Sequence, residues 1–325
     1  MKTMPSVVAL FLISLSPVPT EKMTAQDLAR VKEFYRLAAQ IQDQIWSGWS
    51  KVPTPLLLVT NEQEFLTHVE KAPEGFADAG DGFFVRKRVF PPNLEATFPA
   101  FGPPDVIVVG TPENTASKKS VPWLMVLMHE HFHQLQDAQP NVYQLVEQLG
   151  LSRGDKTGMW MLNFPFPYEK PEVAASFAAM RDASLAALAE TDEKKFASLA
   201  AEYVQKRKAF FAGLEPDDRK YFNFQLWREG IARYTEVRCA EVAANYQPSP
   251  EFAALADFTS FADLAKSKRA ATLKELQGIK LAEDKRVMFY SFGAAEGFLL
   301  DRLRPEWKKQ YFEHPFTLDE FFVEN

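Results

Sequence analysis

Three of the five histidines in the 325-residue chain occupy alternate positions in the segment MHEHFHQLQD, residues 128–137. On a strand, His129, His131 and His133 would share one face. On a helix each residue turns by about 100°, so only His129 and His133 would lie together. Imidazole is the commonest side-chain metal ligand, so the local structure decides which of these histidines can share one ion.

The flanking sequence favours a helix over about 121–138. Ser120 is a candidate N-cap, Pro122 falls in the first turn, and the residues that follow include more helix formers than β-branched residues. One side of this helix is an apolar stripe. The stripe consists of Leu124, Leu127, Met128, His131 and Leu135.

The other side of the predicted helix carries the pattern HExxH, with His131 at a free position. Two imidazoles one turn apart can bind one Zn²⁺, and the glutamate beside the first can act as general base on a water at the metal. We therefore predict one zinc ion bound by His129 and His133, with Glu130 as the catalytic base.

The composition is that of a globular enzyme. A length of 325 residues and a hydrophobic content of 46% are enough for one large domain or two moderate ones. A net charge of −6 without a long basic run argues against nucleic acid as a partner. Cys239 is the only cysteine, which excludes an internal disulfide and a zinc site built from cysteines. We interpret it as a small buried residue.

The N-terminus resembles a secretory signal over residues 1–22. A lysine at position 2 precedes an apolar run at 7–15 and then a Ser/Pro/Thr-rich stretch. The run is too short to span a bilayer, so we expect no stable membrane insertion. Export to the periplasm or the extracellular space is the prediction, and an apolar terminus that packs into the core or stays disordered is the alternative.

The chain before the HExxH pattern predicts a helix at 25–46 and a small sheet. Three short runs rich in β-branched and aromatic residues are bounded by Pro, Gly or Asp and are interpreted as strands. They lie at 55–60, 82–90 and 105–110.

Beyond about residue 141 there is almost no strand signal. Residues 171–190 and 192–214 predict an antiparallel helical hairpin. Further helices are predicted at 217–245, 250–256, 260–275, 283–303 and 316–323.

The expected fold class is α+β and mostly helical, with an N-terminal part at 23–120 that contains the sheet and a helical part at 121–325 that carries HExxH.

A catalytic zinc ion usually takes three protein ligands. The remaining histidines, His68 and His314, lack ligand-like surroundings, so a carboxylate is the better candidate. Glu229, in the segment WREGIARYTE at 227–236, lies among apolar residues where an ionised carboxylate needs a compensating charge. Gly230 beside it favours a close approach of two helices.

An alternative is that Glu229 pairs with Arg233 at i+4 on an exposed helix face. We favour the ligand because the two histidines otherwise lack a third partner.

HExxH at 129–133 followed by WREGIARYTE resembles the gluzincin metallopeptidases, a broad group with thermolysin-like and aminopeptidase-like members. The resemblance implies a zincin-like fold, Glu229 as the third zinc ligand, and a peptide or protein as substrate. Gln136 and Gln139 stand where the metzincin pattern has Gly and His, which excludes that group.

Two features depart from the best-known gluzincins. Glu229 follows His133 by 96 positions, a longer spacing, and we interpret the hairpin at 171–214 as an insertion that fills it. The segment GTPEN at 110–114 has Pro where aminopeptidase-type members have Met. We therefore interpret Glu113 as part of a strand-ending turn, with anchoring of a substrate amine as the alternative.

The resemblance also implies an oxyanion partner on a helix after the third ligand, and Tyr290 is the candidate. The alternative is a core tyrosine packed among phenylalanines. These are Phe289, Phe292 and Phe298.

Two further acids are candidates for supporting the ligands. Asp137, one turn after His133, could hold the outer nitrogen of an imidazole or orient a neighbouring helix, with an exposed helix-end residue as the alternative. Glu236 could play a similar part. We expect Arg228 and Arg233 to pair with these acids and assign them no catalytic role.

Residues 158–171, GMWMLNFPFPYEKP, are dense in aromatic residues and prolines. Such a loop could line a substrate cleft for apolar side chains, although loops of this composition more often pack onto their own domain.

These inferences predict an exported zinc peptidase that hydrolyses peptide bonds with metal-activated water. A zinc hydrolase of a non-peptide substrate and a non-catalytic binding protein braced by a metal are the alternatives.

Overall fold

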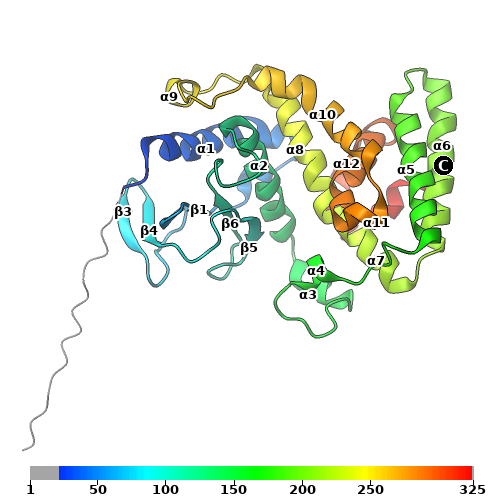
Figure 1. The fold of residues 1–325 in the computed structure, drawn as a ribbon, viewed down its shortest axis with the longest axis horizontal. Coiled ribbons are helices and arrows are strands. Elements are labelled where there is room, and N and C mark those ends of the chain that lie inside the picture. The colour runs from blue at the N-terminus through cyan, green and yellow to red at the C-terminus, as the bar shows by residue number, and fades with distance from the viewer. Residues whose placement is uncertain (1–21, 324–325) are drawn as a thin grey trace, which may run out of the picture.

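The computed structural model describes residues 22–323. A sheet and two helices, α1 (Ala25–Ile45) and α2 (Ser120–Asp137), form one half, and the remaining helices form most of the other (Figure 1). The predicted α+β, mostly helical class is confirmed. The predicted signal at 1–22 lies outside the described residues except for Lys22, and export stays a prediction.

The sheet in this part of the chain has six strands in the order β3-β4-β2-β1-β6-β5. The β1–β6 pair is parallel, and every other neighbouring pair is antiparallel. The strands are β1 (Leu56–Val59), β2 (Gln63–Thr67), β3 (Ala77–Gly80), β4 (Phe83–Lys87), β5 (Glu95–Phe98) and β6 (Val106–Gly110).

The sequence predicted three of these strands, β1, β4 and β6. The other three are short and lack a clear apolar alternation: QEFLT in β2, ADAG in β3 and EATF in β5. Strands β3 and β5 also form the two edges of the sheet. Their pairing depends on neighbours that a local pattern does not contain.

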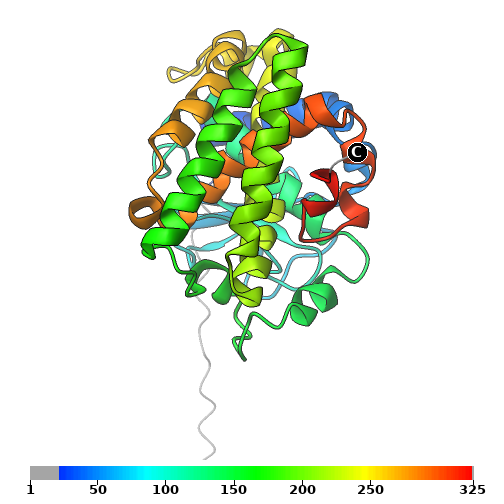
Figure 2. The same ribbon diagram turned by 90° about the vertical axis from the view of Figure 1, so that its right-hand side faces the viewer.

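The helices after α2 form most of the second half. They are α3 (Val142–Gln148), α4 (Trp160–Asn163), α5 (Pro171–Ala189), α6 (Glu193–Ala212), α7 (Pro216–Gln225), α8 (Ile231–Val242), α9 (Pro250–Ala253), α10 (Phe261–Gly278), α11 (Leu281–Asp284) and α12 (Met288–Leu303). Of these, α9 contacts α1 of the first half (Figure 1). The pair α5 and α6 lies side by side on the outside of this half, joined by residues 190–192 (Figure 2). None of the helices within 22–323 combines the length and apolarity needed to cross a bilayer.

Helix α2 is buried on nearly all sides, which explains its continuous apolar sequence. It contacts β5 and β6 on one side and α1 and α8 on others. Leu58 and Ile107 from the sheet join Leu127 of α2 in the main core. The HExxH residues are thus fixed between the sheet and the helical half.

Helix α7 passes into α8 through a π-helical turn, Leu226–Gly230, that contains Glu229. Such turns are rare and are frequently found at functional sites. Next to it, Gly230 meets Gly293 of α12 so closely that a Cβ on Gly230 would lie 2.6 Å from the Gly293 Cα. The close helix approach expected at Gly230 is present, and it brings α12 against the turn that presents Glu229.

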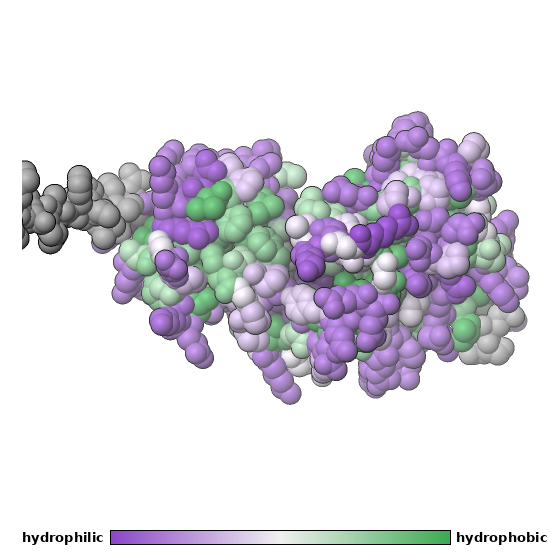
Figure 3. Space-filling model, turned by 90° about the horizontal axis from the view of Figure 1, so that it is seen from below, coloured by the Kyte–Doolittle hydropathy of each residue, from purple (hydrophilic) through white to green (hydrophobic). Residues whose placement is uncertain are grey.

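The opposite face of the sheet has a separate, smaller apolar cluster built on Leu57, Val59 and Val108. Phenylalanines from the strands and loops cover it, and apolar side chains gather over this half of the surface in Figure 3.

Candidate metal centre

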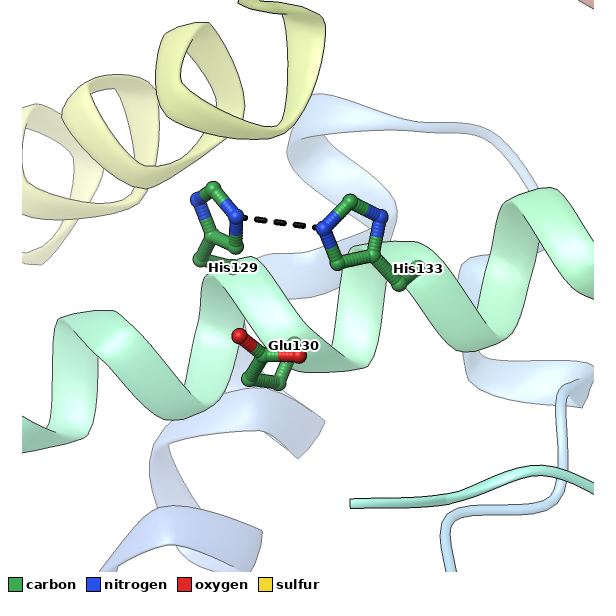
Figure 4. A group of neighbouring side chains, drawn as sticks. All are labelled: His129, Glu130 and His133. Atoms are coloured by element: carbon green, nitrogen blue, oxygen red, sulfur yellow. Dashed lines mark hydrogen bonds between the residues drawn. The ribbon is translucent and has the colours of Figure 1, made fainter. Parts of the chain in front are cut away.

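His129, Glu130 and His133 form a buried group on α2 that could hold a metal ion. One ligand atom from each lies within 4.8 Å of the others. The Nε2 atoms of the two histidines converge to 3.2 Å, with Glu130 beside them (Figure 4). Each of the three residues is at most 6% exposed. The helical geometry separates His131 from this group, as the sequence predicts.

Glu229 adds a fourth side chain from the π-helical turn. Its Oε2 lies 3.7 Å from His129 Nε2 and 3.5 Å from His133 Nε2. A tetrahedral ion with bonds of about 2.0–2.1 Å needs ligand atoms about 3.3 Å apart. The two nitrogens and this oxygen have nearly that mutual spacing, so the residues fit one zinc ion with a fourth position left for water or substrate.

The hydrogen bonds of Gln136 fix the tautomer of His133. The Gln136 Nε2 group donates to the Trp227 carbonyl at 2.9 Å, which leaves its Oε1 to accept from His133 Nδ1 at 2.7 Å. His133 therefore carries its proton on Nδ1 and has the Nε2 lone pair free for a metal. Gln136 is fully buried, so this orientation is rigid.

His129 is supported in a similar way by Glu236. The Glu236 Oε2 lies 3.5 Å from His129 Nδ1, and the carboxylate also contacts Arg233 at 3.1 Å and Lys268. Burial opposes ionisation of Glu236, but Arg233 and Lys268 hold its pKa well below the usual range.

The acidic side chains and the two histidines of the centre change one another's pKa values. Burial lowers the pKa of His129, but hydrogen bonds to Glu229 and Glu236 outweigh it and raise that pKa to about 9. Burial also opposes ionisation of Glu229, while His133 and His129 bring its pKa well below the ordinary value. Without a metal, the Glu229 and Glu236 carboxylates thus favour the protonated form of His129, and a cation would replace that proton.

Glu130 is oriented by the edge strand β5. Its Oε2 accepts a hydrogen bond from Thr97 Oγ1 at 2.8 Å. Glu95, on the same face of β5, lies near enough that burial and the Glu130 charge raise the pKa of Glu95. The strand therefore holds the Glu130 carboxylate in place without pairing it to a cation.

Tyr290 lies over the centre from α12. Its ring stacks on His129 with centroids 5.9 Å apart, and its hydroxyl accepts a hydrogen bond from Arg286 Nη1 at 3.4 Å. Burial and the Glu229 charge raise the pKa of Tyr290, so the hydroxyl keeps its proton and can donate it in a hydrogen bond.

Asp137 fixes the position of the π-helical turn. Its two oxygens accept hydrogen bonds from Arg228 at 2.7 and 2.9 Å. The outer nitrogen of His133 is held by Gln136, as described above. Burial raises and the Arg228 guanidinium lowers the pKa of Asp137, with a net decrease. The expected pairing of Arg228 and Arg233 with nearby acids is present, with Asp137 and Glu236 respectively.

Asp105 lies near Asp137, the last residue of α2, and the two carboxyl groups affect each other's charge. Its carboxyl accepts a hydrogen bond from Tyr143; burial and neighbouring Asp137 raise the pKa of Asp105 to about 6, although the Tyr143 bond opposes this. A raised pKa means that its contribution to stability is complete below about pH 4 and is lost as the pH rises through about 6.

Asp105→Asn mimics the protonated carboxyl and is expected to stabilise the protein by about 1–3 kcal/mol at pH 8 and by nearly nothing at pH 4. Urea unfolding of wild type and variant at both pH values measures this. A variant that is less stable than wild type at pH 8 would show that the carboxylate form is the favoured one.

Gln136→Leu is expected to weaken zinc binding by about 10- to 100-fold, because His133 loses the partner that fixes its tautomer. Competition with a chromophoric chelator measures the change. Gln139→Leu is the matched control, since Gln139 follows the end of α2 and its side chain donates to the Leu135 carbonyl and not to His133. An unchanged zinc affinity for the Gln136 variant would contradict this role.

His131 and Glu113 lie outside the candidate metal centre and have other partners. The His131 ring contacts Gln134 and Gln42, each at 2.9 Å, and burial lowers its pKa to about 4. Glu113 pairs with Arg30 at 2.6 Å.

Sequence reasoning missed four residues of the centre. Thr97 lies on a strand that carries no clear signal, and Arg286 and Lys268 reach the centre only through helix packing. Gln136 had a local signal that could have found it, because it follows His133 by three positions on the same helix.

Comparisons of the chain with protein-family models, curated proteins and solved structures find no match. The function is therefore inferred from the geometry of the centre.

Proposed function

We propose that the protein is a gluzincin-type zinc peptidase, with His129, His133 and Glu229 as the ligands of one ion. The observation that carries the proposal is the mutual spacing of 3.2, 3.5 and 3.7 Å among two imidazole nitrogens and one carboxylate oxygen. The two nitrogens come from α2 and the oxygen from the π-helical turn, and the buried Glu130 carboxylate lies beside the two histidines.

A bound zinc ion would polarise the scissile carbonyl and make the attacking water more acidic. Glu130 takes the proton from that water and passes it to the leaving amine. Thr97 keeps the Glu130 carboxylate turned toward the centre while this happens. Tyr290, which keeps its proton, donates a hydrogen bond to the oxygen of the carbonyl as negative charge develops there.

The presence of a carboxylate base at Glu130 favours a hydrolase over a binding protein in which the metal only stabilises the fold. Ligands alone would serve a brace, and Glu130 would then be dispensable. A zinc hydrolase of a non-peptide substrate remains the second enzyme candidate, since the same residues would activate water for it. The helix pair α5–α6 is proposed as the insertion that separates the two zinc-binding segments, and export by the N-terminal segment is proposed as well.

Digestion of a mixed peptide library tests the proposal. The zinc-loaded protein is expected to cleave peptides, to lose the activity after chelation and to regain it when zinc is restored. Cleavage that is indifferent to the chelator would contradict the metal's role. A protein that binds zinc but cleaves no peptide would exclude the peptidase and favour one of the alternatives.

A further inference from the structure

An open pocket of about 710 Å³ lies between the loop that joins α4 to α5 and the segment before α12. The loop belongs to the segment 158–171, for which the sequence allowed a cleft-lining role. Its side of the pocket is mainly aromatic and proline. These residues are Phe164, Pro165, Phe166, Pro167 and Tyr168. A side chain bound here would therefore be apolar or aromatic.

Arg286 connects this pocket to the candidate metal centre. It lines the pocket, and its Nη2 lies 3.5 Å from Glu229 Oε1. Its Nη1 makes one long hydrogen bond of 3.4 Å to the Tyr290 hydroxyl, and its buried Nε makes no hydrogen bond within residues 22–323. Arg228, by contrast, uses two short bonds to bind Asp137.

The pocket is locally positive in a protein of net charge −6. The charged residues that line it are Lys170, Lys285, Arg286 and Glu169. Lys285 pairs with Glu169 at 3.1 Å. This acid therefore does not neutralise Lys170 or the Arg286 guanidinium, which lies on the side of the pocket toward the centre. The charge favours an anionic occupant with an apolar body.

We propose that Arg286 binds the free α-carboxylate of a C-terminal residue whose apolar side chain occupies this pocket. The planar guanidinium can donate two parallel hydrogen bonds to a carboxylate. This inference rests on the proposed function and narrows it to hydrolysis of the last amide bond of a peptide or of an N-acyl amino acid.

The position of Arg286 sets which bond is cleaved. The guanidinium is in contact with Glu229, a proposed ligand, and one residue of chain spans only about 3.8 Å. When Arg286 binds the carboxylate of the C-terminal residue, the carbonyl of the residue before it can therefore reach the centre. The bond between these two residues is then the one that is cleaved. Water adds to that carbonyl carbon, the C–N bond breaks, and the released amino acid carries away the proton on its amine.

Binding of a small probe pair tests the anchor without any turnover. We expect 3-phenylpropanoate to bind the zinc-loaded wild type at least about 10-fold more tightly than 3-phenylpropanamide, because a charge-assisted hydrogen bond is lost with the amide. Arg286→Ala should reduce this preference to about twofold or less, and Arg286→Lys should keep part of it. Lys280→Ala removes a nearby cation that pairs with Glu283 and does not line the pocket, so it is the control and should keep the whole preference.

Calorimetry gives the affinities, and the zinc content of each variant is measured first so that loss of the ion is not mistaken for loss of the anchor. Wild type without a preference for the acid, or an Arg286→Ala protein that keeps the preference with its zinc in place, overturns the proposal. Failure of 3-phenylpropanoate to bind the zinc-loaded wild type overturns it too.

Cleavage of a peptide as its free acid and as its C-terminal amide separates the two proposals. Selective cleavage of the acid at its last bond supports both. Equal cleavage of acid and amide leaves the peptidase standing and removes the carboxylate anchor. An Arg286-dependent acid preference in binding, with no cleavage of either peptide, leaves the anchor standing and removes the peptidase.

Discussion

Replacing Glu130 by glutamine is expected to lower kcat/KM for peptide hydrolysis by about 10²- to 10⁴-fold, the range for loss of a general base. Glutamine keeps the size of the side chain and an oxygen that can accept the hydrogen bond from Thr97, but it cannot take a proton. The fold and the zinc affinity should therefore stay close to those of wild type.

Steady-state kinetics on one peptide, together with zinc content, measure this effect. Glu147→Gln on α3 is the matched control, because Glu147 is exposed and should be neutral. A Glu130→Gln protein that holds zinc and keeps activity within a few-fold of wild type would contradict the assignment of the base.

Replacing Glu229 by glutamine should raise the zinc dissociation constant by at least about 100-fold, more than the change of a ligand's neighbour causes. The substitution removes the negative charge that faces both imidazoles at 3.5–3.7 Å. Competition with a chromophoric chelator at fixed pH and salt measures the constant. Glu241→Gln on α8, whose carboxylate pairs with Arg238 and Arg269, is the control and should bind zinc normally.

The same titration distinguishes two ligand sets. If Glu229→Gln binds zinc as wild type does while Glu130→Gln loses the ion, then the metal is held by His129, Glu130 and His133 alone. The proposed set predicts the reverse order, because Glu229 is the ligand and Glu130 acts on the water.

Helix α2, which carries the candidate metal ligands, could be predicted because its signals are local. The angular period of a helix places His129 and His133 together and puts His131 on the other side, and no tertiary information is needed for that. The apolar sequence around them predicts burial, which α2 has on nearly all sides. If residues 128–137 formed a strand, His131 would lie on the same face as His129 and His133 and would be a third equivalent ligand.

The proximity of Glu229 to the histidines was a weaker inference, since 96 positions separate it from His133. It depended on the cost of burying an unpaired carboxylate and on a family resemblance. The π-helical turn that presents Glu229 has no signature in WREGIARYTE, and the Gly230–Gly293 contact depends on how α12 packs.

The surroundings of the centre were the least predictable. Thr97 lies on EATF, a four-residue edge strand whose pairing with β6 comes from the sheet and not from its own pattern. Arg286 lies in a short segment before α12 and reaches Glu229 only in the folded chain. Such contacts depend on tertiary packing, so composition and periodicity do not contain them.

Anomalous diffraction across the zinc edge, from a crystal of the zinc-loaded protein, tests the proposed ligand set. One peak is expected within about 2.0–2.2 Å of His129 Nε2, His133 Nε2 and a carboxylate oxygen of Glu229. The absence of a peak at this position, or a peak bound by Glu130 with Glu229 turned away, would contradict it.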